Sequence, residues 1–112
     1  MTMSPRTELF GSRRRTQVLE LIALLENSYA TEIARLVRVP LRTVQRIILD
    51  LEVERIVVTR ISGRERWASL DRRSPIYAQL RELLLALAAS DQEVWDAATR
   101  LRRRPRRIGK PA

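Results

Sequence analysis

Apolar residues recur every three or four positions along the first half of the chain, the spacing of helices that bury one face. One such segment covers residues 13–26 and follows Ser12, whose hydroxyl suits a helix N-cap. A short second helix is expected after Thr31 as its N-cap. A third covers about residues 41–54, with Pro40 in its first turn because proline lacks an N–H. The positions expected to face inward are Val18, Leu21, Ile22, Leu25, Ile33, Ala34, Val37, Val44, Ile47, Ile48 and Leu51.

The spacing then changes to that of strands. Residues 56–61 are rich in β-branched side chains, residues 65–70 alternate between their two faces, and Gly63 lies in the turn between them. Two short strands joined by a glycine turn predict a β-hairpin. The break before the second helix also leaves room for a minor strand near Tyr29.

Two further helices are expected in the last third of the chain. Ser74 and Pro75 suit the N-cap and the first position of a helix that runs to about Ala89. The segment Ser90-Asp91-Gln92-Glu93 matches a capping box, so a last helix is expected to run to about Leu101. The predicted order, α-α-α-β-β-α-α, corresponds to a mainly α (α+β) fold.

The length of 112 residues fits one domain. No apolar run approaches the roughly 20 residues that a membrane span needs, and residues 1–10 lack the layout of a signal peptide. Disulfides are excluded because the chain has no cysteine. We therefore expect a cytoplasmic protein that does not bind a membrane.

The net charge of +9 is concentrated towards the end of the chain. Seven of the 22 basic residues lie between Arg100 and Lys110, where no acidic residue occurs, so the rest of the chain is nearly balanced. Such a cationic tail suits nucleic acid or an anionic membrane surface, or simply keeps the chain soluble. The charge alone does not identify the partner of the domain.

The second and third predicted helices have the spacing of a helix-turn-helix motif. Counted from Ala30, the motif needs a small residue at the fifth position, where the two helices cross closely, and Ala34 stands there. The inward apolar positions of the motif are occupied by Ile33, Val37, Val39, Val44 and Ile47. The ninth position usually holds glycine with a positive φ; Arg38 occupies it, which costs about 1 kcal/mol if that conformation is kept. Because a hairpin follows at once, the pattern predicts a winged helix-turn-helix whose third helix is the recognition helix.

Four outward positions near the start of the recognition helix carry hydrogen-bonding side chains, namely Arg42, Thr43, Gln45 and Arg46. Arginine can pair with guanine, glutamine with adenine, and threonine can contact a phosphate or the thymine methyl group. An ordinary solvated helix face would use the same residue types, but within this predicted helix no acidic residue occurs before Asp50. The pattern therefore favours contact with double-stranded DNA.

Further residues lie where contacts with flanking DNA are expected. Arg64 and Arg66 belong to the turn region of the hairpin, the wing, although Arg66 could pair instead with a nearby carboxylate. Three arginines oppose the helix dipole at the start of the first helix, which suggests a phosphate nearby unless the cluster is merely tolerated. The predicted DNA-binding set is completed by these arginines and the start of the second helix: Arg13, Arg14, Arg15 and Thr31.

Three stretches resemble the ArsR/MarR-like winged helix transcriptional regulators: residues 9–13, residues 29–34, and Val44-Gln45-Arg46 with Asp50-Leu51-Glu52. The resemblance covers about residues 9–70. It implies a homodimer whose outer helices pair and whose recognition helices enter successive major grooves. Many ArsR-type members sense metals, but a soft-metal site is excluded here because the chain has neither cysteine nor histidine. No metal or other cofactor is therefore expected.

The last two predicted helices carry more apolar residues than one face of so small a domain needs. We expect a homodimer interface there, with the alternative that the stripe packs only on its own domain. The chain accordingly divides into a flexible N-terminal arm (1–11), a winged helix-turn-helix domain (12–72), a helical dimerisation segment (73–101) and a basic disordered tail (102–112). The residues expected at the interface are Ile76, Leu80, Leu83, Leu84, Leu87, Val94 and Trp95.

Catalysis is not expected, because most acid–base and nucleophilic arrangements need histidine or cysteine, and no glycine-rich phosphate loop occurs. The favoured function is a homodimeric DNA-binding transcriptional regulator, most simply a repressor, associated with the nucleoid. A winged helix used as a protein-interaction or RNA-binding module in a larger assembly is the alternative. The sequence identifies no small-molecule effector.

Overall fold

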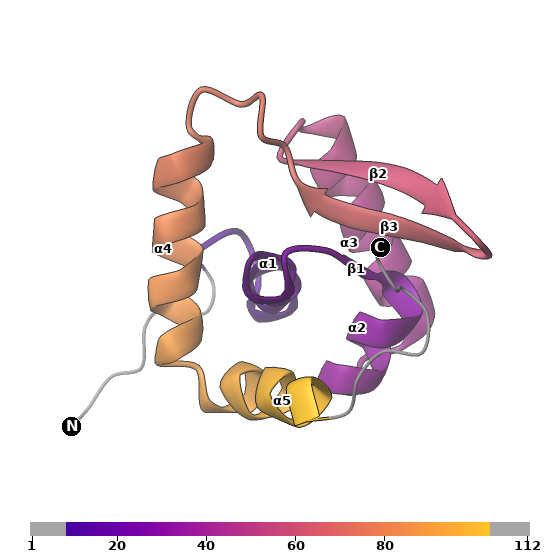
Figure 1. Ribbon diagram of the computed structural model, residues 1–112, viewed down its shortest axis with the longest axis vertical. Helices are drawn as coiled ribbons and strands as arrows, with labels where there is room; N and C mark the ends of the chain where they lie inside the picture. Colours follow the sequence, from indigo (N-terminus) through magenta and orange to yellow (C-terminus); the bar gives the residue numbers. More distant parts are fainter. Residues whose placement is uncertain (1–8, 104–112) are drawn as a thin grey trace.

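A computed structural model describes residues 9–103, with side chains as far as Leu101. Within this range the chain forms an α+β domain of five helices and a three-stranded antiparallel sheet (Figure 1). The predicted helices and hairpin are present and the minor strand near Tyr29 is added to them, so the α+β class is confirmed. Most of the predicted arm (1–11) and of the basic tail (102–112) lies outside the described residues. The elements are α1 (Arg13–Leu25), β1 (Ser28–Tyr29), α2 (Ala30–Val37), α3 (Leu41–Val53), β2 (Val57–Ser62), β3 (Glu65–Leu70), α4 (Tyr77–Ala89) and α5 (Gln92–Arg103).

Helix α1 lies at the centre of the domain. Figure 1 shows it nearly end-on, with α2, α4, α5 and the sheet arranged around it. Every residue from Thr16 to Ala23 is buried, and two full turns of a helix can be buried in this way only when neighbours cover all sides. The sequence predicted a single apolar face for this helix. The burial of Gln17 and Glu20 is therefore a feature that the structure adds.

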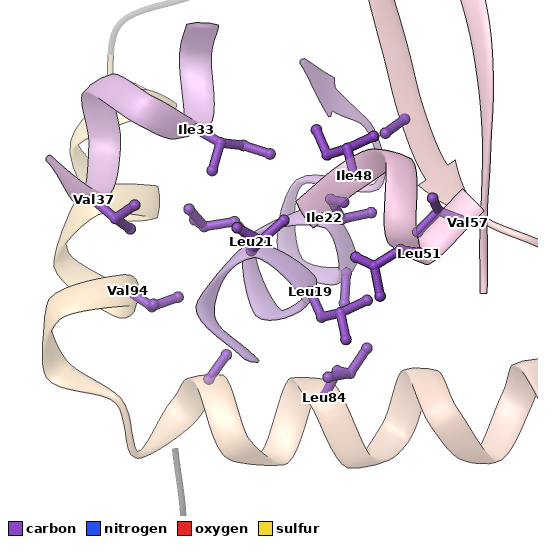
Figure 2. Close-up of a cluster of buried hydrophobic side chains, with 14 of the residues drawn as sticks. Leu19, Leu21, Ile22, Ile33, Val37, Ile48, Leu51, Val57, Leu84 and Val94 are labelled. Carbon is purple, nitrogen blue, oxygen red and sulfur yellow. The ribbon is translucent and has the colours of Figure 1, made fainter. Parts of the chain in front are cut away.

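One hydrophobic core surrounds α1 (Figure 2). Burial of each large aliphatic side chain contributes about 1.5–3 kcal/mol, so the core is the main source of stability. Helices α4 and α5 belong to the same core as residues 12–72, so the expected boundary at residue 72 does not separate two cores. The residues that the other elements add around Leu19, Leu21 and Ile22 include Ile33, Val37, Val44, Ile48, Leu51, Val57, Ala68, Leu84 and Val94.

Strands β2 and β3 form the predicted hairpin. Ser62 pairs with Glu65, which leaves a two-residue turn in which Gly63 has a φ of 65°. Arg64, the second residue of the turn, does not have a positive φ. This combination is typical of a type II′ turn, which favours glycine at its first position.

Strand β1 extends the sheet on the other side of β3, giving the order β1-β3-β2. Ser28 pairs with Ala68 and Tyr29 with Trp67. The rings of Tyr29 and Trp67 lie edge to face with their centroids 4.7 Å apart. Because α2 begins directly after β1, this pairing ties the start of α2 to the hairpin.

The first and third helices begin as predicted, whereas the second begins two residues before the prediction. Ser12 Oγ accepts a hydrogen bond from the backbone N–H of Arg15 at 3.0 Å, so Ser12 caps α1. Thr31 is not an N-cap, because the chain enters α2 directly from β1 and the helix already begins at Ala30. Pro40 was expected in the first turn of α3 and stands at its N-cap, one position before the first helical residue.

The two C-terminal helices begin later than predicted. Ser74 is part of a turn, in which its carbonyl accepts a hydrogen bond from the N–H of Tyr77, and α4 begins only at Tyr77. The capping box predicted from Ser90 is wrong. Asp91 immediately precedes α5, and its Oδ1 accepts a hydrogen bond from the N–H of Val94 at 3.3 Å. The carboxylate of Glu93, expected in the capping box, contacts α1 instead.

Arginines occupy the turns in which α2 and α3 end. Arg38 has the left-handed conformation expected at this turn, with φ 57° and ψ 48°. The carbonyl of Ala34 accepts a hydrogen bond from the N–H of Val39 at 3.1 Å, which completes a Schellman-type cap. Arg55 follows α3 with a φ of 63°. Each of these residues carries a steric cost of about 1 kcal/mol that a glycine would avoid.

Candidate nucleic-acid interface

Helix α3 is attached to the domain along one side. Val44, Ile48 and Leu51 are buried there. Towards the end of the helix, the Thr59 hydroxyl of β2 donates a hydrogen bond to Glu52 Oε2 at 2.7 Å. The helix is thus held by the core and by the hairpin, and its other side faces outward on a fixed support.

The first half of this outer side carries the residues predicted to contact bases. Arg42, Gln45 and Arg46 are exposed, and Thr43 is half-buried. None of the three exposed side chains has a hydrogen bond or an ion pair with another residue of the 9–103 range. Their donors are therefore available to a partner outside the domain.

The second half of the outer side is apolar and acidic. Leu49 is 57% exposed and Val53 is 80% exposed. They follow Gln45 at steps of four residues, which places all three on one face of the helix. Sequence reasoning missed these two residues, although the same spacing argument would have found them.

The hairpin presents its two predicted arginines differently. Arg64 lies exposed in the turn, with no hydrogen bond or ion pair to the described part of the chain. Arg66 is also exposed, but its Nη1 donates a hydrogen bond to Thr59 Oγ1 at 3.1 Å. It forms an ion pair with neither Glu65 nor Asp71. Arg66 thus belongs to a chain of hydrogen bonds that runs through Thr59 to α3.

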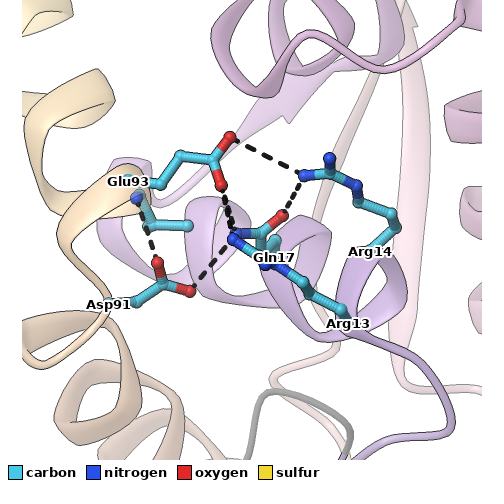
Figure 3. Close-up of polar contacts among 6 residues, drawn as sticks. Arg13, Arg14, Gln17, Asp91 and Glu93 are labelled. Carbon is cyan, nitrogen blue, oxygen red and sulfur yellow. Dashed lines mark hydrogen bonds and ion pairs between the residues drawn. The ribbon is translucent and has the colours of Figure 1, made fainter. Parts of the chain in front are cut away.

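The three arginines at the start of α1 have anionic partners inside the domain, whereas the sequence predicted a phosphate beside them. Arg13 Nη2 lies 2.9 Å from Glu93 Oε1, and Arg14 Nη1 lies 3.7 Å from Glu93 Oε2 (Figure 3). Arg15 Nη2 lies 2.6 Å from the Oε1 of Glu54, at the end of α3. These contacts offset the unfavourable position of the three charges at a helix N-terminus. Arg13, Arg14 and Arg15 therefore join elements of the domain.

Gln17 connects α1 to the start of α5. Its Nε2 donates hydrogen bonds to Glu93 Oε1 at 3.0 Å and to Asp91 Oδ2 at 3.4 Å, and its Oε1 accepts one from Arg14 at 2.7 Å (Figure 3). The hydrogen bond from Gln17 holds the pKa of Glu93 below its usual value, and the charges of Arg14 and Arg13 act in the same direction. The start of α5 is thus fixed to α1 by a polar network.

Glu20 lies one helical turn further along α1 and is fully buried. Its Oε1 has no hydrogen-bond partner in the described structure. Burial raises the pKa of Glu20 to about 9, and a hydrogen bond with Asp91 and the negative charge of Asp91 contribute to the increase. Glu20 is therefore protonated at neutral pH. The burial of Glu20 could not be predicted from the sequence, since a glutamate in a helix is ordinarily on its solvated face.

The residues predicted for a dimer interface fall into three groups according to their burial in the single chain. Leu84, Leu87 and Val94 are buried in the core of the single chain, so their expected role in an interface is wrong: α1 already covers them. Leu80 is half-buried against the same core. Ile76, Leu83 and Trp95 remain 55%, 42% and 41% exposed. The apolar stripe thus serves mainly its own domain and leaves a smaller exposed remainder.

Thr31, the last residue of the predicted DNA-binding set, is half-buried in the first turn of α2.

Residues 9–103 contain no group of three or more acidic, histidine or cysteine side chains arranged to hold a metal ion. No helix in the same range is long and apolar enough to cross a membrane. Comparisons with protein-family models, with curated proteins and with solved structures gave no match.

Proposed function

We propose that this protein binds double-stranded DNA as a winged helix-turn-helix regulator, with α3 as its recognition helix and the β2–β3 hairpin as its wing. The observation that carries the proposal is the set of free donors on the outer side of α3, namely Arg42, Gln45 and Arg46. The other arginines predicted to contact DNA, apart from Arg64, are bound to groups of the domain itself. Of the arginines predicted to contact DNA, the ones left free lie on the outer side of α3 and in the turn of the hairpin.

The chemistry of these donors fits base edges. A helix enters the major groove of B-DNA, which is about 12 Å wide, and its first turns then face the bases. Arg42 and Arg46 are suited to guanine, and Gln45 is suited to adenine. Leu49 and Val53 offer apolar contact to thymine methyl groups or to sugar carbons further along the groove. Arg64 in the turn of the wing would contact the adjacent phosphates.

The proposed regulator acts as a homodimer. Ile76, Leu83 and Trp95 are large apolar side chains that the monomer leaves exposed. Pairing of two chains through α4 would cover Ile76 and Leu83 and would present two copies of α3 to one duplex. Occupancy of a promoter by such a dimer blocks transcription, which makes a repressor in the cytoplasm, on the nucleoid, the simplest role.

A second candidate function is a protein-interaction module, and it rests on a different observation. Leu49, Val53 and Ile61 are among the most exposed large apolar residues, and they lie on α3 and on β2, which packs against it. An apolar partner surface would cover them. In that case Arg42 and Arg46 would be peripheral to the interface, and duplex DNA would bind only through non-specific charge contacts.

The two candidates are separated by selecting duplexes from a random pool with the purified protein at about 150 mM salt, where non-specific binding is weak. We expect enrichment of one sequence, arranged as two half-sites about 10–10.5 base pairs apart if a dimer binds. Substitution of Arg42 and Arg46 together by alanine should abolish the enrichment, whereas the matched pair Arg13→Ala and Arg14→Ala should not. Sequence-blind binding that disappears at this salt concentration would overturn the proposal.

A further inference from the structure

A groove of roughly 500 Å³ lies between α2 and the C-terminal part of α5. Arg35 and Arg38 line it from the side of α2, and Arg100 lines it from α5. Figure 1 shows α5 and the hairpin on opposite sides of α2. The groove and the hairpin thus flank the α2–α3 pair on its two sides.

Three arginines against one glutamate give the lining of this groove a net positive charge. Arg35, Arg38 and Arg100 are exposed, and none has an ion pair or side-chain hydrogen bond to another residue of the described range. The one acidic residue of the lining, Glu32, is buried and accepts a hydrogen bond from the Ser28 hydroxyl at 2.6 Å. Three guanidinium groups around one groove repel each other unless an anion lies between them.

Arg38 connects the groove to α3, because it lies in the turn just before that helix. It occupies the left-handed turn between Val37 and the start of α3, four residues before Arg42. A glycine would hold this turn at lower steric cost. The substitution Arg38→Gly should therefore remove the side chain, keep the turn and stabilise the fold.

We infer that the groove of Arg35, Arg38 and Arg100 binds phosphate groups of the DNA backbone beside the segment that α3 contacts. The inference rests on the proposed function and extends its contact surface to the side of α2 away from the hairpin. Guanidinium groups are well suited to phosphates, because their planar donors match phosphate oxygens in pairs. Backbone contacts of this kind fix the register of a protein on the duplex and carry no base preference.

The sequence that follows the groove has the same chemistry. Directly after Leu101, which also lines the groove, the chain continues with Arg102 and carries six basic residues up to Lys110. The sequence next to the groove therefore carries more of the residue type that suits phosphates.

The test compares single variants in anisotropy titrations of the full chain with a labelled duplex that carries the selected sequence. Arg38→Gly, Arg35→Ala and Arg100→Ala should each lower the slope of log affinity against log salt by about 0.9, the value for one lost phosphate contact. At about 100 mM salt this corresponds to a roughly eightfold weaker affinity. The preferred base sequence should not change. Arg38→Lys, which keeps the charge, should retain most of the slope.

Arg55→Gly is the matched control. It removes an exposed arginine from the same left-handed conformation at the other end of α3. Both glycine variants should raise the midpoint of urea unfolding, because both relieve the same steric cost. Only Arg38→Gly should weaken binding.

The outcomes separate this inference from the proposed function. If the three groove variants bind like the wild type with an unchanged salt slope, the groove is not a contact site and the inference is overturned, while the proposal for α3 stands. If the groove variants lose affinity but the Arg42 and Arg46 variants keep the base preference, the groove is a phosphate-binding site, and the proposal that α3 recognises bases is overturned. If the wild type binds no duplex, both are overturned.

Discussion

Arg15 Nη2 and Glu54 Oε1 lie 2.6 Å apart and join the first turn of α1 to the end of α3. Asp50 Oδ2 lies 4.0 Å from Nη1 of the same guanidinium. The Arg15 side chain is mostly covered, whereas the two carboxylates are exposed to water. The pair therefore joins α1 to the helix that carries Arg42 and Arg46, and the charge of Arg15 is compensated within the domain.

Substitution of Arg15 by alanine should lower the free energy of unfolding by no more than about 0.5–1 kcal/mol, because the exposed carboxylates are screened by solvent. A double-mutant cycle of Arg15→Ala with Glu54→Ala, followed by urea denaturation, measures the coupling. DNA affinity should change little in any of the three variants. A loss of affinity in Arg15→Ala that Glu54→Ala does not share would restore the phosphate contact that the sequence predicted.

Substitution of Arg46 by alanine should weaken binding to the selected sequence by about 1–3 kcal/mol and relax the preference at one base pair. Arg46 is exposed and free within the described structure, so the fold should be unaffected. Competition titrations with single-base variants of the site measure the effect. Arg55→Ala, an exposed arginine beyond the end of α3, serves as the control. An equal loss on every sequence would make Arg46 a phosphate contact.

Substitution of Leu83 by glutamate should shift the protein from dimer to monomer without unfolding it. Leu83 is 42% exposed, so the charge reaches water in the monomer but would be buried in a dimer formed through α4. Sedimentation equilibrium gives the mass, and circular dichroism checks the fold. Val53→Glu, at a more exposed apolar position on α3, should leave the mass unchanged. The same mass for wild type and Leu83→Glu would remove α4 from the interface.

Substitution of Glu20 by glutamine should make the protein more stable at alkaline pH. The folded domain holds the Glu20 proton until about pH 9, whereas the unfolded chain releases it near pH 4.5. The stability associated with the protonated carboxyl is therefore complete below pH 4.5 and is lost as the pH rises towards 9. The loss is at most about 1.4 kcal/mol per pH unit. The amide of glutamine keeps a donor for Asp91 and does not titrate.

Urea unfolding of wild type and Glu20→Gln at several pH values between 5 and 8.5 measures this difference directly. The advantage of the variant should grow with pH over this interval. The opposite contribution of Glu93, whose pKa is lowered, is common to both proteins and cancels in the comparison. A constant difference would mean that Glu20 ionises alike in the folded and unfolded chains.

Local features of the fold could be predicted from the sequence because their causes are local. The spacing of Val44, Ile48 and Leu51 defined the buried side of α3, and the same spacing left Arg42 and Arg46 on the outside. Ser12 was correctly identified as a cap because an N-cap depends on neighbouring backbone groups only. The hairpin turn at Gly63 is of the same kind.

Features that depend on distant segments could not be predicted. The partner of Arg13 is Glu93, 80 residues further along the chain, and no spacing rule connects them. Periodicity shows which side of a helix is apolar, but it does not show how many neighbours will cover the helix. For this reason the burial of Glu20 was missed, and Leu84 was assigned to an interface although α1 had already covered it.

The central position of α1 has a consequence for the synthesis of the protein. On the ribosome α1 emerges before any other described element, whereas α4 and α5, which cover two of its sides, emerge last. Until then a nascent chain exposes Leu19 and Val18 to solvent and leaves Glu20 free to ionise in water. The domain therefore completes its folding only after α5 has left the ribosome, and a chaperone that binds short apolar helices would find its target in residues 16–25 of the unfinished chain.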